Sequence, residues 1–431
     1  MEGKALKRSE EQPQEFLSIA MDAGQDLERL GKGESQATYF RIETMAEARR
    51  ILSQATPEER KKRSETFLDG LEYRSRIPQG MHDRGEAYVF ANHPLEGEKD
   101  YRGHRNHLPI YVRTISIPEK TVSTGQVWDI TLKPDEWGVD EREEMYNIIN
   151  INKLILEENA SVIVRGNALI FTCQELIKTG ISTKEYDIGI LGTSHGFGNR
   201  KGKFHGESGI KGKDGLPGED GIEPVLGANF LGKVLYPSFK PETMDGKPGT
   251  HGDDGSDGDD GLNGGACRIA ELNIRSIKTS APVVIGIISG DGGNGGSGGN
   301  GGSGGNGGNG IEAVKTIEGM IGPSKAGHGG NGGSGGNGGR AGHGGISSNV
   351  FINVPERAVN LIRVFSKAGF AGEPGKGGLP GNSGLGGYYA EGEDVWHRGS
   401  AGIAGHKGRE GKEGRRMPAA KIYLNNEVRN D

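Results

Sequence analysis

Residues 292–310 read GGNGGSGGNGGSGGNGGNG, so glycine stands at every third position and also at most of the positions beside it. The same count of three recurs in five further runs of nearly equal length. A period of three matches a left-handed polyproline-II helix, in which one face of each run would lack side chains. A bare face is useful where another backbone must come close. The six runs are 206–221, 246–264, 292–310, 327–345, 369–387 and 399–414.

The near-equal lengths of the runs indicate that they lie side by side within one chain. Polyproline-II segments have no internal hydrogen bonds, so neighbouring runs must satisfy their buried N–H and C=O groups. A run of about 20 residues would span roughly 60 Å. The sequence therefore predicts a bundle of about six antiparallel polyglycine-II helices. A trimeric collagen-like stalk is the competing interpretation, but it would be one long proline-rich array rather than six short runs separated by apolar sequence.

The runs differ in composition, which predicts their places in the bundle. Runs three and four consist mostly of Gly-Gly-X triplets, so two of their three faces are bare and we expect them at the centre. Run two is acidic and run six is basic, and opposite charge favours placing them side by side. The aspartates of run two also offer carboxylate ligands to Ca²⁺, the one cofactor that the sequence suggests, with an acidic face that is solvated or pairs with a neighbouring run as the competing interpretation. These candidate ligands are Asp253, Asp254, Asp257, Asp259 and Asp260.

The connectors between the runs alternate in character. Long β-rich segments (148–193, 267–289, 346–367 and 419–428) alternate with shorter, irregular ones (225–244, 311–325 and 388–397). Apolar and polar residues alternate within the β-rich segments, as in half-buried strands. The predicted fold class is therefore mainly β plus polyproline II, with a β-solenoid-like platform from which each turn extends a glycine hairpin.

The N-terminal third has a different composition. Residues 1–40 are polar and predict a flexible tail. Residues 41–107 predict an α-helical region, because Thr56-Pro57-Glu58-Glu59 has the pattern of a capping box before a helix over 57–69, with a second helix over 45–54. The remaining divisions are a platform start over 108–200, the glycine-rich bundle with its interleaved β segments over 201–416 and a terminal strand over 417–431.

Composition narrows the functional class. The chain has 431 residues, 79 glycines, 32% hydrophobic residues and a formal net charge of −6, so apolar core material is scarce outside the β segments. The charge, together with the lack of basic-aromatic patches, argues against nucleic acid as a partner. No stretch predicts a signal peptide or a membrane span, so we expect cytoplasmic synthesis, with association to a virion or particle or release by a non-classical route. Cys173 and Cys267 are expected as buried thiols, with a disulfide as the alternative. No residue pattern predicts a catalytic site, so we expect no enzyme.

The array of glycine runs resembles the polyglycine-II bundles of bacteriophage tail-fibre adhesin tips and of snow-flea antifreeze proteins. The resemblance covers residues 206–414 and is architectural. It implies a rigid glycine core that displays contact loops, and it transfers no individual binding residue.

Three functions are compatible with this sequence. The first is a non-enzymatic, adhesin-like binding module whose distal connectors contact a protein or a cell-surface receptor, because aromatic residues suit recognition. The second is a structural or assembly subunit of a larger particle that docks through residues 1–145. The third is an ice-binding protein. The candidate contact residues for the first function are Tyr236, Phe239, Tyr388, Tyr389 and Trp396.

Overall fold

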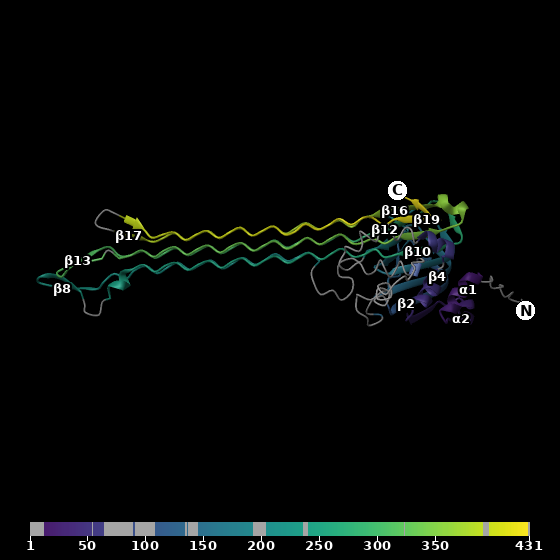
Figure 1. Cartoon of the computed structure of the whole chain (residues 1–431), viewed down its shortest axis with the longest axis horizontal. Coiled ribbons are helices and arrows are strands. Elements are labelled where there is room, and N and C mark those ends of the chain that lie inside the picture. The colour runs from purple at the N-terminus through teal and green to yellow at the C-terminus, as the bar shows by residue number, and fades with distance from the viewer. Residues whose placement is uncertain are drawn as a thin grey trace, which may run out of the picture.

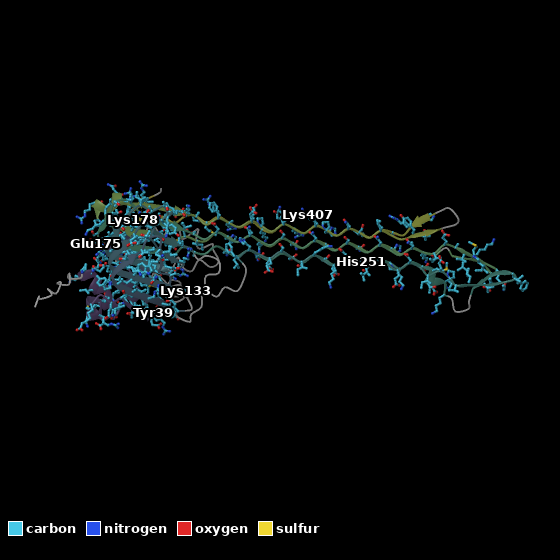
Figure 2. All side chains as sticks on the ribbon, turned by 180° about the vertical axis from the view of Figure 1, so that it is seen from behind. Tyr39, Lys133, Glu175, Lys178, His251 and Lys407 are labelled. Carbon is cyan, nitrogen blue, oxygen red and sulfur yellow. The ribbon has the colours of Figure 1, made fainter. Side chains whose placement is uncertain are left out.

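The protein consists of a β-structured base and a long, thin stalk that ends in small hairpins (Figure 1). Both ends of the described chain lie at the base, and the stalk extends away from it in one direction. Side chains are dense at the base and sparse along the stalk, from which His251 and Lys407 project (Figure 2). The computed structural model describes residues 13–53, 55–63, 89–90, 108–133, 136, 145–192, 204–235, 240–322, 324–390 and 396–429.

Six extended glycine-rich segments form the stalk, and we call them legs 1 to 6 in chain order, with the bounds of the six runs. Consecutive legs are antiparallel. Between legs 2 and 1, Thr250 N donates to Leu216 O, and Asp253 N, three residues later, donates to Lys213 O, three residues earlier. These bonds are 2.9 and 2.8 Å long and repeat with every triplet. The chain therefore runs out along odd legs and returns along even legs.

Alternate legs are parallel and form two layers. Gly249 N donates to His328 O, and Gly252 N donates to Asn331 O, so legs 2 and 4 run in the same direction. Equivalent bonds join leg 4 to leg 6, leg 1 to leg 3 and leg 3 to leg 5. Legs 3 and 4 each bond to four other legs, which confirms their central places. Leg 6 bonds to legs 4 and 5, so the prediction that it lies beside leg 2 is wrong. Backbone bonding, rather than surface charge, sets the order.

The glycines of the legs are required by the closeness of neighbouring backbones. A Cβ on Gly301 of leg 3 would lie 2.0 Å from Gly333 O of leg 4. A Cβ on the next residue, Gly302, would lie 1.9 Å from Lys213 O of leg 1. Such distances are far shorter than van der Waals contact, so any side chain there would force the legs apart. The double glycines of legs 3 and 4 therefore face two neighbours each.

Side chains of one leg also cap backbone N–H groups of the next parallel leg, and we call each such bond a rung. The acceptor is an aspartate, asparagine, histidine or serine side chain, and donor and acceptor are separated by a constant number of residues for each pair of legs. Examples are Asp214 with Ser303 N, Asp254 with Ser334 N, Asn300 with Leu379 N and Asn337 with Arg409 N. The rungs fix the axial register of parallel legs.

One rung gives a pH prediction. Asp214 accepts from Ser303 N at 2.8 Å and from Lys211 Nζ at 2.9 Å. These two bonds, the backbone bond first, lower the pKa of the Asp214 carboxyl below its ordinary value. A lowered folded-state pKa means that the contribution of the rung to stability is present above the unfolded pKa of about 3.9 and is lost as pH falls through the folded pKa. An NMR titration of the Asp214 carboxyl carbon should show a midpoint below that of free aspartate, and a midpoint at or above it would contradict the rung.

The base contains two sheets that share one core. The larger is a mixed nine-stranded sheet, ordered β1-β2-β4-β6-β10-β15-β19-β20, with β11 also pairing with β6. The smaller is a parallel five-stranded sheet, ordered β16-β12-β7-β5-β3. Buried Phe171 and Leu272 of the first sheet and Val162 and Ile285 of the second belong to the same apolar cluster. The larger sheet comprises β1 (Gln36–Ile42), β2 (Ile110–Val122), β4 (Met145–Leu156), β6 (Ala168–Lys178), β10 (Ala270–Ile274), β11 (Ile277–Thr279), β15 (Val350–Asn353), β19 (Ile422–Leu424) and β20 (Glu427–Arg429). The smaller comprises β3 (Val127–Asp129), β5 (Ser161–Arg165), β7 (Ile188–Leu191), β12 (Val283–Ile288) and β16 (Ile362–Lys367), and the 3₁₀ helix η3 (Glu356–Leu361) precedes β16.

The fold class predicted from the sequence is wrong. The platform is not a closed β-solenoid, because the larger sheet ends at each side in an antiparallel strand, β1 paired with β2 and β20 paired with β19. The predicted polyglycine-II helices are not shown either, since no helix or strand is assigned to the six legs. Local apolar alternation reveals strands but not their pairing partners, so it could not exclude the open mixed sheet.

Residues 13–40 contain two helices and most of a strand, in contrast to the predicted flexible tail over 1–40, whose residues 1–12 lie outside the described residues. Helices α1 (Gln14–Asp22) and α2 (Leu27–Gly31) bury Phe16, Ala20 and Leu30 in a small cluster, and β1 joins the larger sheet. The predicted capping box is confirmed. Thr56 N donates to the Glu59 carboxylate at 2.7 Å, and Glu59 N donates to Thr56 Oγ1 at 3.2 Å. The helix that they begin is described over residues 57–63, and α3 (Met45–Leu52) is the second predicted helix.

Among the described residues of the base, two ion pairs are buried on both sides. Arg63 Nη1 lies 2.9 Å from the carboxylate of Glu271 on β10, and Lys178 Nζ on β6 lies 2.7 Å from the carboxylate of Asp187, directly before β7. Cys173 and Cys267 are buried and form no disulfide, and burial raises the pKa of the Cys173 thiol to about 12. These groups hold the base together and face away from solvent.

Candidate functional site: the distal tip

The three connectors at the far end of the stalk each form a two-stranded hairpin, and we call residues 222–245, 311–326 and 388–398 together the tip. The tip lies at the end of the stalk opposite the base (Figure 1). The hairpins are β8 (Leu226–Asn229) with β9 (Gly232–Leu235), β13 (Val314–Thr316) with β14 (Gly319–Ile321) and β17 (Tyr388–Ala390) with β18 (Trp396–Arg398). A 3₁₀ helix, η2 (Pro241–Met244), leads back into leg 2.

The β8–β9 turn presents two apolar residues to solvent. Asn229 Oδ1 accepts from Leu231 N at 2.9 Å, and Gly232 has a positive φ of 134°, so the turn between them is held by local bonds. Phe230 is 95% exposed and Leu231 is 67% exposed. Covering an exposed phenylalanine side chain with a partner would gain about 1.5 to 3 kcal/mol that the chain itself does not gain at this position.

The β13–β14 hairpin packs against the first one. Thr316 Oγ1 accepts from Glu318 N at 3.2 Å and donates to Gly319 O at 3.0 Å, which closes the turn. Ile317 N donates to Lys233 O at 3.0 Å, so the two hairpins are linked through their backbones. This bond makes them one unit rather than two independent loops.

The third hairpin carries several aromatic residues that contact one another or a cation. The Arg398 guanidinium lies over the Tyr388 ring, 4.4 Å from its centroid, and also donates to the Tyr388 hydroxyl. Tyr389 stacks on His397 with ring centroids 5.2 Å apart. Tyr388 N donates to Asn309 Oδ1 at the end of leg 3, so a rung anchors this hairpin to the stalk.

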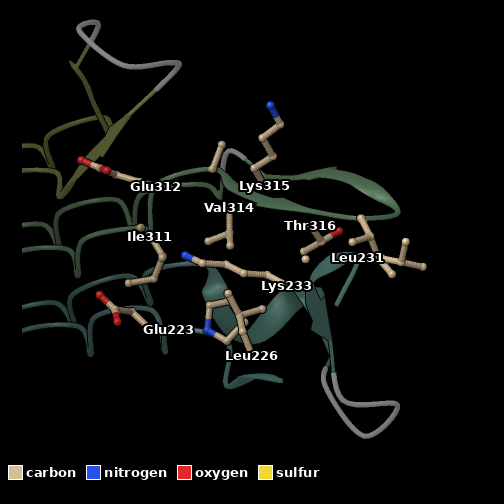
Figure 3. Close-up of a pocket in the computed structure, with 14 residues that line it drawn as sticks. Glu223, Leu226, Leu231, Lys233, Ile311, Glu312, Val314, Lys315 and Thr316 are labelled. Atoms are coloured by element: carbon tan, nitrogen blue, oxygen red, sulfur yellow. The ribbon is translucent and has the colours of Figure 1, made fainter. Parts of the chain in front are cut away.

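A groove of about 880 Å³ runs between the first two hairpins (Figure 3). Apolar residues line it together with Glu223, Lys233, Glu312 and Lys315. Lys233 extends across the space between the hairpins, whereas the Lys315 side chain points away from it (Figure 3). Gly310, the last residue of leg 3, also lines it. Its lining residues are Glu223, Pro224, Leu226, Leu231, Gly232, Lys233, Gly310, Ile311, Glu312, Ala313, Val314, Lys315, Thr316 and Ile317.

Exposed apolar side chains gather at the tip. They come from all three hairpins and from the segment that joins leg 1 to the first hairpin. Contiguous exposed apolar surface is typical of contact sites. The exposed large apolar residues of the tip are Ile222, Val225, Phe230, Leu231, Ile317, Met320 and Tyr388.

The structure places part of the predicted contact set at the tip. Tyr388 is exposed and Tyr389 is half-buried, and both lie on β17. Trp396 lies on β18, where it pairs with Ala390. Tyr236 and Phe239 lie outside the described residues. Sequence reasoning missed the Phe230–Leu231 turn, although an apolar pair between two turn formers, Asn229 and Gly232, was a readable signal.

The structure does not bring the five predicted calcium ligands together. Asp254, Asp257 and Asp260 each accept a backbone N–H from leg 4, at 2.5 to 2.6 Å. Asp253 and Asp259 belong to another row of leg 2, and their backbone carbonyls accept from leg 3. Over the residues that the structure describes, no group of three or more His, Cys, Asp or Glu side chains could hold a metal ion. The three aspartates that form rungs therefore join leg 2 to leg 4.

No protein-family model, curated protein or solved structure matches this chain. None of the helices in the described ranges is long and apolar enough to cross a membrane.

Proposed function

We propose that this protein is a non-enzymatic binding module in which the stalk holds the tip at a distance from the base and the tip contacts a protein or a cell-surface receptor. The observation that carries the proposal is the exposure of Phe230 and Leu231 at the tip of β8–β9, beside a groove of about 880 Å³. Apolar and aromatic anchors at the centre of a contact surface commonly dominate interface energy.

The construction of the stalk supports the same proposal. Each leg has 16 or 19 residues in an extended course, and the stalk that they form separates the tip from the base (Figure 1). Backbone hydrogen bonds repeat along the whole stalk, which makes it a stiff spacer. The resemblance to phage tail-fibre adhesin tips agrees with a glycine array that displays contact loops.

The proposal is tested by removing the apolar surface of the tip. In a Phe230→Ser/Leu231→Ser/Ile317→Ser variant, binding of fluorescently labelled protein to a panel of intact bacterial and eukaryotic cells should fall at least about tenfold, because buried apolar anchors contribute several kcal/mol to an interface. Flow cytometry measures the binding, and a melting curve checks the fold.

The matched control is Met21→Ser/Ile181→Ser, which removes two exposed apolar side chains of the base. It should leave binding unchanged. Equal binding by a folded tip variant, or a wild-type protein that binds no cell in the panel, would refute the tip as a receptor-contact surface.

A further inference from the structure

The even layer of the stalk has an outer face, which we call the 2-4-6 face. On leg 4, a Cβ on Gly330 would meet Thr250 O of leg 2 at 1.9 Å, and a Cβ on Gly332 would meet Gly381 O of leg 5 at 2.2 Å. Since a leg has three rows of residues, the third row must point away from both neighbours. On leg 4 this row is His328, Asn331, Ser334, Asn337, Arg340 and His343.

Rungs align this row with one row of leg 2 and one row of leg 6. Asp257 accepts from Asn337 N at 2.6 Å, and Asn337 Oδ1 accepts from Arg409 N at 3.0 Å. These three residues therefore stand at the same height along the stalk, one on each leg. The same offsets align Asp254 with Ser334 and His406, and Asp260 with Arg340 and Lys412.

The 2-4-6 face is acidic along one edge and basic along the other. Leg 2 contributes Asp254, Asp257 and Asp260, and leg 6 contributes Arg409 and Lys412 at matching heights, all of them exposed. The leg 6 row also contains His406 and Arg415. Within the described ranges, no ion pair engages the cations of this row, because leg 4 separates them from the acidic edge. At one height of the acidic edge Asp260 pairs with Arg340 of leg 4, whose Nη2 lies 2.8 Å from the carboxylate. The acidic edge on leg 2 and the basic edge on leg 6 are complementary and cannot meet within one chain.

We propose that a second copy of this chain binds the 2-4-6 face, face to face and with both stalks pointing the same way. A twofold axis parallel to the legs would set leg 4 against leg 4 and the acidic edge of each copy against the basic edge of the other. Such a rotation preserves height along the stalk, so Asp257 would face the second copy's Arg409 and Asp260 would face its Lys412. Interfaces of this kind are self-complementary by symmetry, and charge fixes their register.

Charge also selects the direction of the two stalks. A twofold axis across the legs would make the stalks antiparallel and would set leg 2 against leg 2 and leg 6 against leg 6. Like-charged edges would then face each other, which disfavours that arrangement. On the opposite face, acidic and basic residues are not separated onto different legs. Leg 5 carries Glu373 and Lys376 in one row, and leg 1 carries Lys211 and Asp214 in one row. The pattern is therefore specific to the 2-4-6 face.

The first test changes the charges. Sedimentation equilibrium of the full chain should show a dimer whose dissociation constant rises with salt. Arg409→Glu/Lys412→Glu should raise that constant at least about tenfold, because four facing pairs would change from attraction to repulsion. Asp254→Asn/Asp257→Asn/Asp260→Asn should also raise it, while each amide oxygen still accepts its rung. Lys376→Glu, on the opposite face, is the control and should change nothing.

The second test determines whether the two stalks of the dimer are parallel or antiparallel. Ser334→Cys and Arg340→Cys each place a thiol on leg 4, two rungs apart, and the two native cysteines are buried. In the parallel dimer each variant alone should form a disulfide-linked dimer on mild oxidation. Every residue of leg 4 then faces the same residue of the second copy. Antiparallel stalks would allow this at one height at most. A monomeric wild type, unchanged association of the Arg409→Glu/Lys412→Glu chain, or cross-linking at only one position would overturn the proposal.

Discussion

Gly301→Val is expected to destabilise the stalk by about 3 kcal/mol or more, the upper end of the cost of overpacking. The valine Cβ would begin 2.0 Å from Gly333 O and 2.5 Å from the carbon of the same carbonyl, and both are backbone atoms that cannot turn aside. Legs 3 and 4 would have to separate, which would also break the bond from Gly333 N to Gly302 O. Calorimetric melting and amide exchange of legs 3 and 4 measure the loss.

Ser303→Val is the matched control for Gly301→Val. It lies two residues further along the same leg, in the row that already carries side chains, so the same branched residue replaces an existing Cβ. We expect a change within about 0.5 kcal/mol, as for other partly exposed positions without a specific role. Equal destabilisation by the two valines would mean that the legs are not held at the spacing described above.

The count of three predicted the number of legs, their bare faces and the central places of legs 3 and 4. It did not predict the order of the outer legs. The prediction relied on the weak attraction between the charged surfaces of legs 2 and 6, whereas backbone hydrogen bonds determine which legs are neighbours. A better signal lies in the triplets themselves. Asp, Asn and His recur in one row of legs 2, 3 and 4, and legs 5 and 6 lack this pattern, as expected if no further parallel leg follows them.

The base was less predictable than the stalk. Strand-like alternation was visible over 268–277, but the residues of β10 are buried on both faces, and Glu271 remains among them because Arg63 pairs with it. That partner is more than 200 positions away in the sequence, so no local pattern could show it. The N-terminal helices were missed for a related reason. Phe16 and Leu30 are among the few apolar residues of a polar segment, and their burial depends on the sheet beside them.

The sequence predicted where the tip lies, but it did not predict which of its residues are exposed. Alternating connectors placed residues near 225, 311 and 388 at one end of the stalk, and all three hairpins lie there. The choice of aromatic residues as contacts overlooked that Tyr388 is already engaged by Arg398, whereas Phe230 has no such cover. Exposure depends on which neighbours a turn meets, and the bond from Ile317 N to Lys233 O that joins two hairpins has no counterpart in local sequence.

The two sheets of the base meet at the buried pair of Lys178 and Asp187. Lys178 Nζ donates to the Asp187 carboxylate at 2.7 Å and to Pro282 O at 2.9 Å. The same carboxylate accepts from Val284 N at 2.7 Å, so the pair links β6 of the larger sheet to β7 and β12 of the smaller one. Both side chains are less than 5% exposed. Neither charge can gain solvent if its partner is removed.

Lys178→Met should therefore destabilise the base by about 3 to 5 kcal/mol, because the Asp187 carboxylate would stay buried without a counter-charge. Methionine keeps most of the volume, so packing loss contributes little. The matched control is Lys153→Met on the neighbouring strand β4, whose pair with Glu119 is exposed and 3.3 Å long; it should cost less than about 1 kcal/mol. Urea unfolding followed by far-ultraviolet circular dichroism compares the two, and similar midpoints would show that the buried pair does not lock the sheets together.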